Sequence, residues 1–284
     1  MKIVITGSSG LLGRTLYKVL LPHHVIALEH KHLDINSERD VINCFKDIMP
    51  DVVINCAAFT KVDDCELNPV KAFEVNAIGA RNVALACECV GARLITISTD
   101  YVFDGDKSGE YTEEDKATGG YTVYGRSKLW GEKLVELYCT NYVIVRTAWL
   151  YGKGGPSFVH SILEKSSNQD SIQVVNDQYG NPTSALAVSL TISQILYNSS
   201  IKGIFHVTCE GTTSWYEFAK EIINIAELNI KINPCSSDKL KRIAKRPANS
   251  SLSKNKLKQF NLKPVPHWKK EIRYFLYTDL MKKK

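Results

Sequence analysis

The stretch Lys2-Ile-Val-Ile-Thr-Gly-Ser-Ser-Gly-Leu-Leu-Gly13 decides the fold of this chain. Its first part, Lys2–Thr6, is an apolar run that predicts a buried strand, and Leu11–Leu20 predicts a helix entered directly from the loop. The glycines between and within them, Gly7, Gly10 and Gly13, leave room for a pyrophosphate to approach the backbone and the positive end of the helix. Strand, glycine loop and helix in this order predict a dinucleotide-binding site rather than a merely structural turn.

Strand-like and helical patterns continue to alternate through the first half of the chain, which is typical of a parallel sheet with helices on both faces. The predicted strands are Val25–Leu28, Asp51–Ala57, Arg93–Ser98 and Tyr142–Thr147, and the predicted helices are Asn68–Val90, with a proline at its first turn, and Tyr124–Tyr138. We therefore predict an α/β fold, a Rossmann-type doubly wound parallel sheet.

The second half is divided by prolines into shorter elements. Helices are predicted at Phe158–Lys165, Leu186–Tyr197 and Trp215–Ala226, the last with Ser214 as its N-cap and Glu217 at N3. We expect residues 1–150 to form the dinucleotide-binding lobe and residues 151–284 a smaller C-terminal substrate lobe, packed closely with a ligand cleft between them.

Composition excludes several classes of protein. With 284 residues, 44% of them hydrophobic, the chain can bury a sizeable core, and neither a signal peptide nor an apolar stretch of membrane-spanning length is evident. The eight cysteines include no Cys-x-x-Cys pair, so we expect reduced thiols and a cytoplasmic protein. Much of the net charge of +6 comes from the C-terminal region, including Lys282–Lys284, which we interpret as a solvated basic tail. We expect neither nucleic acid nor membrane as a partner.

The pair Tyr124 and Lys128 suggests hydride chemistry. A spacing of four places both side chains on one helix face, where an ammonium could lower the pKa of a phenol toward neutrality and make it a better general acid or base. Such a pair is often only a solvated surface pair, and it gains weight here because a glycine loop opens the chain.

Two hydroxyls, a carboxylate and an aromatic ring follow the strand Arg93–Ser98, in the order Ser98, Thr99, Asp100, Tyr101. Strand ends in open α/β sheets face the ligand crevice. A hydroxyl there can stabilise the oxyanion that develops as a carbonyl accepts hydride, although each hydroxyl alone could simply cap a turn.

The residues at the end of the second predicted strand leave the preference between NADPH and NADH open. Glu29 can bind the ribose hydroxyls and would repel a 2′-phosphate, whereas His30, Lys31 and His32 could receive one. Asp34 could meet the adenine amino group or could simply be a solvated loop residue. Either NADPH or NADH fits this pattern.

The spacing Gly-x-x-Gly-x-x-Gly and seven further segments resemble the extended short-chain dehydrogenases and reductases, and within them the dTDP-4-dehydrorhamnose reductase family, over nearly the whole chain. These segments are Asn55–Asp63, Val75–Ala77, Ser98–Gly105, Val123–Lys128, Arg146–Gly152, Asp177–Thr183 and Arg246–Ser250. The resemblance implies NAD(P)H-dependent reduction of the C4 ketone of dTDP-4-dehydro-L-rhamnose to dTDP-L-rhamnose, a precursor of cell-surface polysaccharide.

The same resemblance implies a role for each matching residue. Thr99 would polarise the carbonyl, Tyr124 would protonate the developing alkoxide, and Lys128 would complete the catalytic set and hold the nicotinamide ribose. The implied cofactor residues are Gly7, Gly10, Leu11, Leu12, Gly13, Glu29, Asp34, Ile35, Ala57, Ala58, Phe59, Tyr124 and Lys128. The implied substrate residues are Thr60, Val62, Asp100, Tyr101, Trp149 and Arg246, with Arg246 facing a diphosphate oxygen.

Three alternative functions stay open. Nucleotide-sugar dehydratases of the superfamily carry an Asp-Glu pair after the strand threonine, and Asp100-Tyr101 argues against elimination here. Another nucleotide-sugar reductase or epimerase is a further alternative. The third is a non-catalytic dinucleotide-binding regulatory subunit resembling that of methionine adenosyltransferase, which retention of Thr99, Tyr124 and Lys128 makes the weaker interpretation.

The chain departs from the family pattern before the catalytic helix. Gly119 and Gly120 stand where relatives commonly have proline and leucine or isoleucine, and we expect them to loosen this loop. Ala148 replaces a serine, which we expect to be tolerated. The sequence leaves open which base the nucleotide-sugar carries, whether the protein is a homodimer and whether it binds a divalent ion such as Mg²⁺. No cluster of ligands for such an ion is evident in the sequence.

Overall fold

A computed structural model describes residues 1–280 of the chain, so the basic segment Lys282–Lys284 lies outside the described residues. Its centre is a six-stranded sheet in the order β10-β5-β4-β3-β1-β2 in which every neighbouring pair is parallel. The strands are β1 (Lys2–Thr6), β2 (His24–Leu28), β3 (Val52–Asn55), β4 (Arg93–Thr99), β5 (Tyr142–Thr147) and β10 (Gly203–His206). The predicted Rossmann-type sheet is confirmed, and its order reverses between β1 and β3, where ligands bind in such folds.

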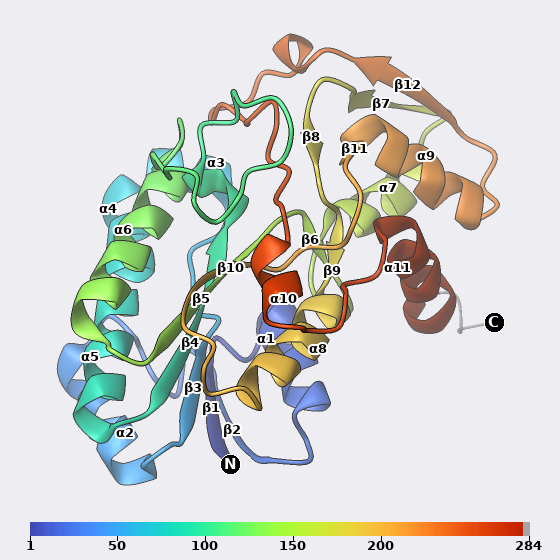
Figure 1. Cartoon of the computed structure of the whole chain (residues 1–284). Helices are drawn as coiled ribbons and strands as arrows, with labels where there is room; N and C mark the ends of the chain where they lie inside the picture. Colours follow the sequence, from blue (N-terminus) through green and yellow to red (C-terminus); the bar gives the residue numbers. More distant parts are fainter. Residues whose placement is uncertain (281–284) are drawn as a thin grey trace.

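Helices cover both faces of the sheet (Figure 1). One face carries α2 (Glu38–Ile48), α5 (Ala80–Val90) and α6 (Val123–Tyr138), and the other carries α1 (Leu11–Val19) and α8 (Ala185–Leu196). Successive side chains of β1 point to opposite faces of the sheet and so enter two separate hydrophobic cores. Ile3 and Ile5 belong to the core beneath α1 and α8, and Val4 belongs to the core beneath α2 and α5. The central strands are therefore buried on both faces.

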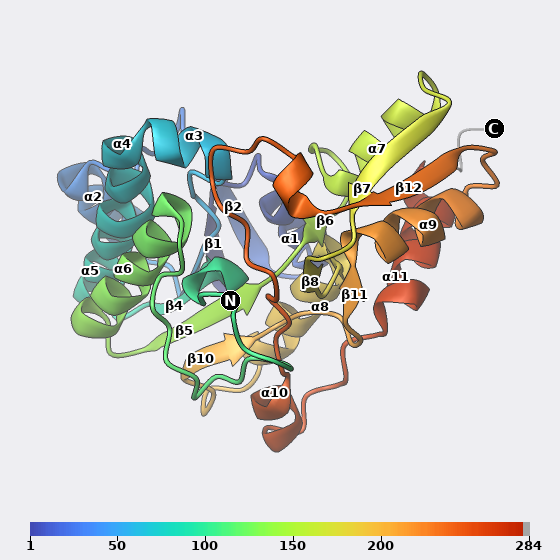
Figure 2. The same cartoon turned by 90° about the horizontal axis from the view of Figure 1, so that it is seen from above.

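The smaller lobe lies beside the carboxyl ends of the strands and is seen from above in Figure 2. It contains α7 (Phe158–Ser166), β7 (Ser171–Val175), α9 (Trp215–Ile225), β12 (Lys231–Cys235) and α11 (Trp268–Phe275). Short strands β6 (Leu150–Tyr151), β8 (Tyr179–Gly180), β9 (Thr183–Ser184) and β11 (Thr213–Ser214), the turn Ser237–Lys239 and α10 (Asn255–Gln259) make the remaining connections. A division of the chain into lobes at residue 150 stays a proposal, since α8 and β10 of the second half return to the large sheet.

The predicted helix Asn68–Val90 is interrupted. Its N-terminal proline lies at N1 of α4 (Pro69–Phe73), as predicted, but Glu74–Gly79 forms a π-helical segment before α5 begins. A short helix, α3 (Val62–Leu67), precedes it. π-Segments inside helices are frequent at functional sites, and this one carries the buried Asn76.

Other local predictions agree closely with the structure. Ser214 caps α9 by accepting the backbone N–H of Glu217 at 3.1 Å, and all eight cysteines are free thiols. Within residues 1–280, no helix has both the length and the apolar character needed to cross a membrane.

Candidate active site

A cleft of about 390 Å³ opens at the carboxyl ends of β1, β3 and β4, next to the sheet's switch point. It brings together fourteen of the residues to which the family resemblance gives a cofactor, catalytic or substrate role: Gly7, Gly10, Leu11, Leu12, Gly13, Ala58, Thr60, Val62, Thr99, Asp100, Tyr101, Tyr124, Lys128 and Trp149. Cys56, Ile97, Ser98, Thr147, Ala148, Leu150 and Pro156 also line it. Residues from both halves of the chain thus share one cavity.

The glycine loop fits tightly against the end of β3. Gly7 has a φ of +63°, and a Cβ atom there would lie 2.6 Å from the Ala57 backbone nitrogen, so only glycine allows this approach. Gly10 begins α1 without a side-chain cap, which leaves the first N–H groups of the helix to an anionic ligand. This geometry fits the diphosphate of a dinucleotide.

The entry to α6 is fixed by three contacts. The Thr122 hydroxyl accepts the Gly125 N–H at 2.9 Å, and the Glu66 carboxylate accepts the Val123 N–H at 2.7 Å. The two preceding glycines adopt left-handed conformations: Gly119 has a φ of +86° and Gly120 one of +58°, and the Gly119 N–H donates to the Val102 carbonyl at 2.8 Å. Both φ values favour glycine, and a Cβ at Gly120 would in addition lie 2.6 Å from the Phe103 carbonyl oxygen, whereas one at Gly119 would meet Arg126.

Tyr124 and Lys128 both lie in the cleft and are both buried. Burial raises the pKa of Tyr124 above its usual value, with interaction with the Thr99 hydroxyl opposing the rise. The expected shift of this pKa toward neutrality is therefore wrong for this structure, because desolvation dominates. The phenol is protonated at neutral pH, the state that a proton donor needs.

Lys128 is held by the sheet. Its Nζ donates to the Ile97 carbonyl at 2.7 Å, and burial lowers the pKa of the ammonium to about 8, while the carboxylate of Glu132 raises it in part. The side chain is thus fixed at the floor of the cleft and titrates close to physiological pH.

The end of β4 supplies a hydroxyl and a carboxylate. The Thr99 hydroxyl donates to Asp100 Oδ1 at 2.9 Å and accepts the Tyr101 backbone N–H at 3.2 Å. Asp100 is 3% exposed, and burial raises the pKa of its carboxyl to about 6. Tyr101 packs edge-to-face on Tyr124, with ring centroids 5.5 Å apart. The strand end therefore surrounds the phenol with polar groups.

Asn76, which the sequence analysis did not place in the site, links the π-segment to the cleft. Its amide accepts the Phe59 N–H at 2.8 Å and donates to the Phe59 carbonyl at 3.0 Å and the Ser127 hydroxyl at 3.0 Å. Ser127 precedes Lys128, and Phe59 lies between the cleft residues Ala58 and Thr60. An asparagine in the middle of a helical pattern was the sequence signal for this role.

Sequence reasoning also missed a buried ion pair that lies beneath Ser98 and Lys128. Glu132, one turn beyond Lys128, accepts two bonds from Arg146 at 2.9 and 2.7 Å and one from Ser98 Oγ at 2.5 Å. The two side chains are only 1–2% exposed. The pair joins α6 to β4 and β5 directly under the cleft.

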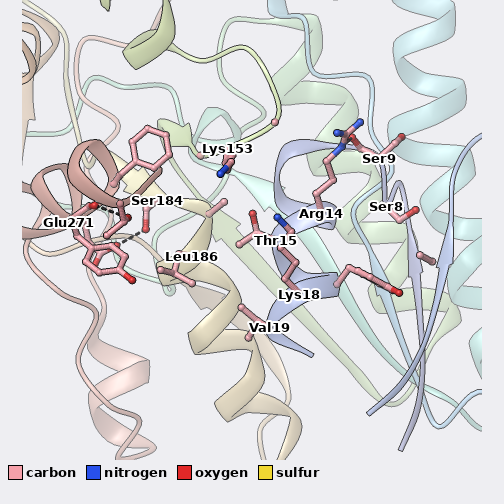
Figure 3. A pocket seen from close by; sticks show the side chains of 18 of the residues that line it. Ser8, Ser9, Arg14, Thr15, Lys18, Val19, Lys153, Ser184, Leu186 and Glu271 are labelled. Atoms are coloured by element: carbon pink, nitrogen blue, oxygen red, sulfur yellow. Dashed lines mark hydrogen bonds between the residues drawn. The ribbon is translucent and has the colours of Figure 1, made fainter. Parts of the chain in front are cut away.

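A second and larger cavity, of about 760 Å³, lies on the other side of α1 (Figure 3). Arg14 and Lys18 project from α1 and Lys153 from the loop after β6, while Ser184 donates to Glu271 at 2.5 Å on the far wall. Glu29 lines this cavity and pairs with Lys31 at 3.4 Å. Ser8 and Ser9 complete the edge nearest the glycine loop.

The other predicted cofactor residues lie nearby but outside the cleft. Asp34 is exposed and caps its own turn by accepting the Asn36 N–H at 3.0 Å. Ile35 is buried, and its carbonyl accepts the amide of Asn82 at 2.9 Å. Phe59 lines a separate surface pocket with Lys61 and Lys71.

Arg246 lies at the boundary of the smaller lobe. Its Nη2 donates to Asp63 Oδ2 at 2.9 Å, and Asp63 also accepts the Ala244 N–H at 3.0 Å. Arg246 lines a cavity of about 540 Å³ together with Arg242 and Lys245. The same cavity is also lined by Asp104, Asp106, Asp177 and Asp238, so its charge is mixed and Arg246 is the cation in it that lies next to α3. In residues 1–280, no three His, Cys, Asp or Glu side chains gather as a metal site would require.

Comparison with known proteins places this cleft in a family context. The family model of the RmlD substrate binding domain matches residues 1–280. A dTDP-4-dehydrorhamnose reductase of Streptomyces griseus is 39% identical over 94% of this chain and 90% of its own length, and the spore coat polysaccharide biosynthesis protein SpsK of Bacillus subtilis is 37% identical over 97% and 96%. The crystal structure of the Bacillus anthracis dTDP-4-dehydrorhamnose reductase in complex with NADP superimposes with a TM-score of 0.95, at 37% identity over 97% of this chain and 98% of that one.

Proposed function

Because the chain belongs to the family of the RmlD substrate binding domain, we propose that it is an NAD(P)H-dependent oxidoreductase that reduces the C4 ketone of dTDP-4-dehydro-L-rhamnose to dTDP-L-rhamnose. The observation that carries this proposal is the shared cleft, in which Thr99, Tyr124 and Lys128 meet the glycine loop. The product would serve the synthesis of a polysaccharide, as the name of the SpsK relative indicates for that protein.

The protein's own side chains would polarise the substrate carbonyl and donate one proton to its oxygen. When bound, a reduced nicotinamide would supply the hydride that C4 of the sugar accepts. Thr99 turns its proton from Asp100 toward the carbonyl oxygen, and Tyr124 transfers its phenolic proton to that oxygen as the alkoxide forms. Lys128, cationic at neutral pH, favours the resulting phenolate and holds the cofactor ribose.

We propose NADPH as the preferred cofactor. Lys31 offsets the charge of Glu29, and the Arg14 guanidinium lies on the same cavity edge, where its Nε donates to the Ser9 carbonyl at 2.6 Å. A fixed cation there suits a 2′-phosphate. Arg14→Gln should raise KM for NADPH several-fold and leave KM for NADH almost unchanged; equal effects on both would contradict this assignment.

On the substrate side, we propose that Arg246 meets a diphosphate oxygen of the dTDP-linked 4-keto-6-deoxyhexose. Asp63 fixes its orientation and leaves Nη1 without a partner among the described residues. A homodimer and a cytoplasmic location stay proposals from the sequence.

The function is tested by incubating the purified protein with NADPH and enzymatically generated dTDP-4-dehydro-L-rhamnose. We expect oxidation of NADPH and formation of one equivalent of dTDP-L-rhamnose. Tight NADPH binding without turnover would instead support the regulatory-subunit alternative, and turnover confined to a UDP-linked substrate would change the base assignment.

A further inference from the structure

Trp149, which lines the catalytic cleft, has an unusual backbone conformation. Its φ is +48°, in the left-handed region that bulky side chains rarely adopt. Such a conformation is unfavourable and persists only where the surroundings enforce it, often at ligand-binding sites. The contacts of this indole must therefore include the groups that enforce it.

The indole of Trp215, the first residue of α9, stacks on that of Trp149. The ring centroids are 3.4 Å apart and the planes differ by 5°. Aromatic pairs prefer an offset or edge-to-face arrangement, so near-complete overlap indicates that neighbouring groups impose the stack. Phe158 provides one of these contacts, with its ring centroid 4.4 Å from that of Trp215.

The strand pair β8–β11 adds a second constraint. A Cβ atom on Gly180 would lie 2.5 to 2.8 Å from atoms of the Trp149 indole, so glycine is required for the strand to approach this ring. Gly180 pairs with Thr213, two residues before Trp215. One unit of the smaller lobe thus supplies both the stacking ring and the close backbone that bound Trp149.

Within residues 1–280, the lining of the catalytic cleft includes Trp149 but does not include Trp215. Trp149 follows the end of β5. It packs against the core beneath α1 and α8 and also against a small hydrophobic cluster that contains Phe103 and Ala148. In this structure Trp215 therefore meets the cleft through its stack on Trp149.

We propose that Trp215 is a positioning residue that fixes the Trp149 indole in the catalytic cleft, so that the smaller lobe controls binding of the sugar part of the substrate. This inference rests on the proposed function. An indole binds the C–H face of a sugar and the methyl group of a 6-deoxyhexose through apolar contact, which requires a fixed ring plane. The nucleotide, bound elsewhere, should be insensitive to Trp215.

The test compares Trp215→Ala and Trp215→Phe with Trp130→Phe, a matched control on the exposed face of α6, where Trp130 is 58% exposed. Two stacked indoles give a paired positive and negative circular dichroism band, measured without ligand. We expect the band in the wild type and in Trp130→Phe, and its loss in both Trp215 variants and in Trp149→Phe. Persistence of the band in Trp215→Ala would overturn the stacking assignment.

Ligand binding supplies the functional measurement. Trp215→Ala should weaken dTDP-L-rhamnose binding by about tenfold, and Trp215→Phe by less, because its ring keeps part of the contact. Affinities for dTDP and NADPH should stay within about twofold of wild type. Equal loss for dTDP and dTDP-L-rhamnose, or wild-type binding of both, would overturn the proposal.

The two levels of inference fail differently. If the wild type shows the band but neither binds dTDP-L-rhamnose better than dTDP nor turns over the keto sugar, the proposed function is wrong and the role assigned to Trp215 falls with it. If the wild type turns over the substrate and Trp215→Ala does so with unchanged KM, only the positioning role is wrong.

Discussion

Loss of one partner of the buried pair Glu132–Arg146 should destabilise the protein strongly. Glu132 accepts three hydrogen bonds, two from Arg146 and one from Ser98, and both charged side chains are almost completely buried. Removing one member leaves the other charge in the interior without compensation, at a cost of about 3–5 kcal/mol. We therefore expect Glu132→Met and Arg146→Met each to lower the free energy of unfolding by about 3–5 kcal/mol.

The double variant distinguishes this explanation from simple loss of packing. Replacing both members with apolar side chains removes both charges, so Glu132→Met/Arg146→Met should cost less than either single change. Lys133→Met is the matched control on the same helix, because Lys133 pairs with Glu136 at the surface and should contribute under about 1 kcal/mol. Urea unfolding followed by circular dichroism gives all four values. A single-variant loss below about 1 kcal/mol, or a double variant equal to the sum of the singles, would refute the reasoning.

Three further predictions concern the cleft. The pKa of Lys128 is about 8 and the proposed mechanism requires its cationic form, so kcat/KM should fall as pH rises through about 8. Lys128→Arg should move this fall to higher pH, and an unchanged profile would exclude Lys128 as its source. Burial raises the pKa of the Asp100 carboxyl from 3.8 to about 6, so its buried charge destabilises the folded state above pH 6 and this cost is relieved as pH falls. The stability of the wild type relative to Asp100→Asn should therefore improve by about 1 kcal/mol between pH 7 and pH 5. Urea unfolding of both proteins at the two pH values measures this difference. Gly120→Ala should reduce kcat and stability more than Gly109→Ala does. Both glycines have a positive φ, but only a Cβ atom at Gly120 would clash with the backbone, 2.6 Å from the Phe103 carbonyl oxygen. Equal effects of the two substitutions would show that this clash is relieved at no cost.

Five of the six sheet strands and the residues of the central cleft could be predicted from the sequence because their signals are local, whereas the short strand β10 of the second half was not predicted. The run Lys2–Thr6 and the glycines after it specify β1 and the start of α1. The spacing of four between Tyr124 and Lys128 places both side chains on one face of α6 by helix geometry alone. Helix bounds were correct to within about two residues, apart from the π-segment, because caps such as Ser214 are visible in sequence.

What sequence reasoning missed depends on long-range contacts. Asn76 acquires its role only because a π-segment brings it to Phe59 and Ser127, and Glu132 meets Arg146 only when α6 packs on β5. The pKa of Tyr124 was predicted in the wrong direction because helical spacing describes the neighbouring charge but not burial. The stack of Trp149 on Trp215 joins residues from two lobes and has no local signal.

Tyr124→Phe tests the central claim most directly, because it removes one hydroxyl from a buried ring. The measurement is single-turnover reduction of dTDP-4-dehydro-L-rhamnose by saturating NADPH, with NADPH affinity determined separately by fluorescence. We predict that the variant binds NADPH as the wild type does and loses a factor of at least about 100 in the rate of reduction, as expected for loss of a general acid. A wild-type rate in Tyr124→Phe would contradict the assignment of this phenol as the proton donor.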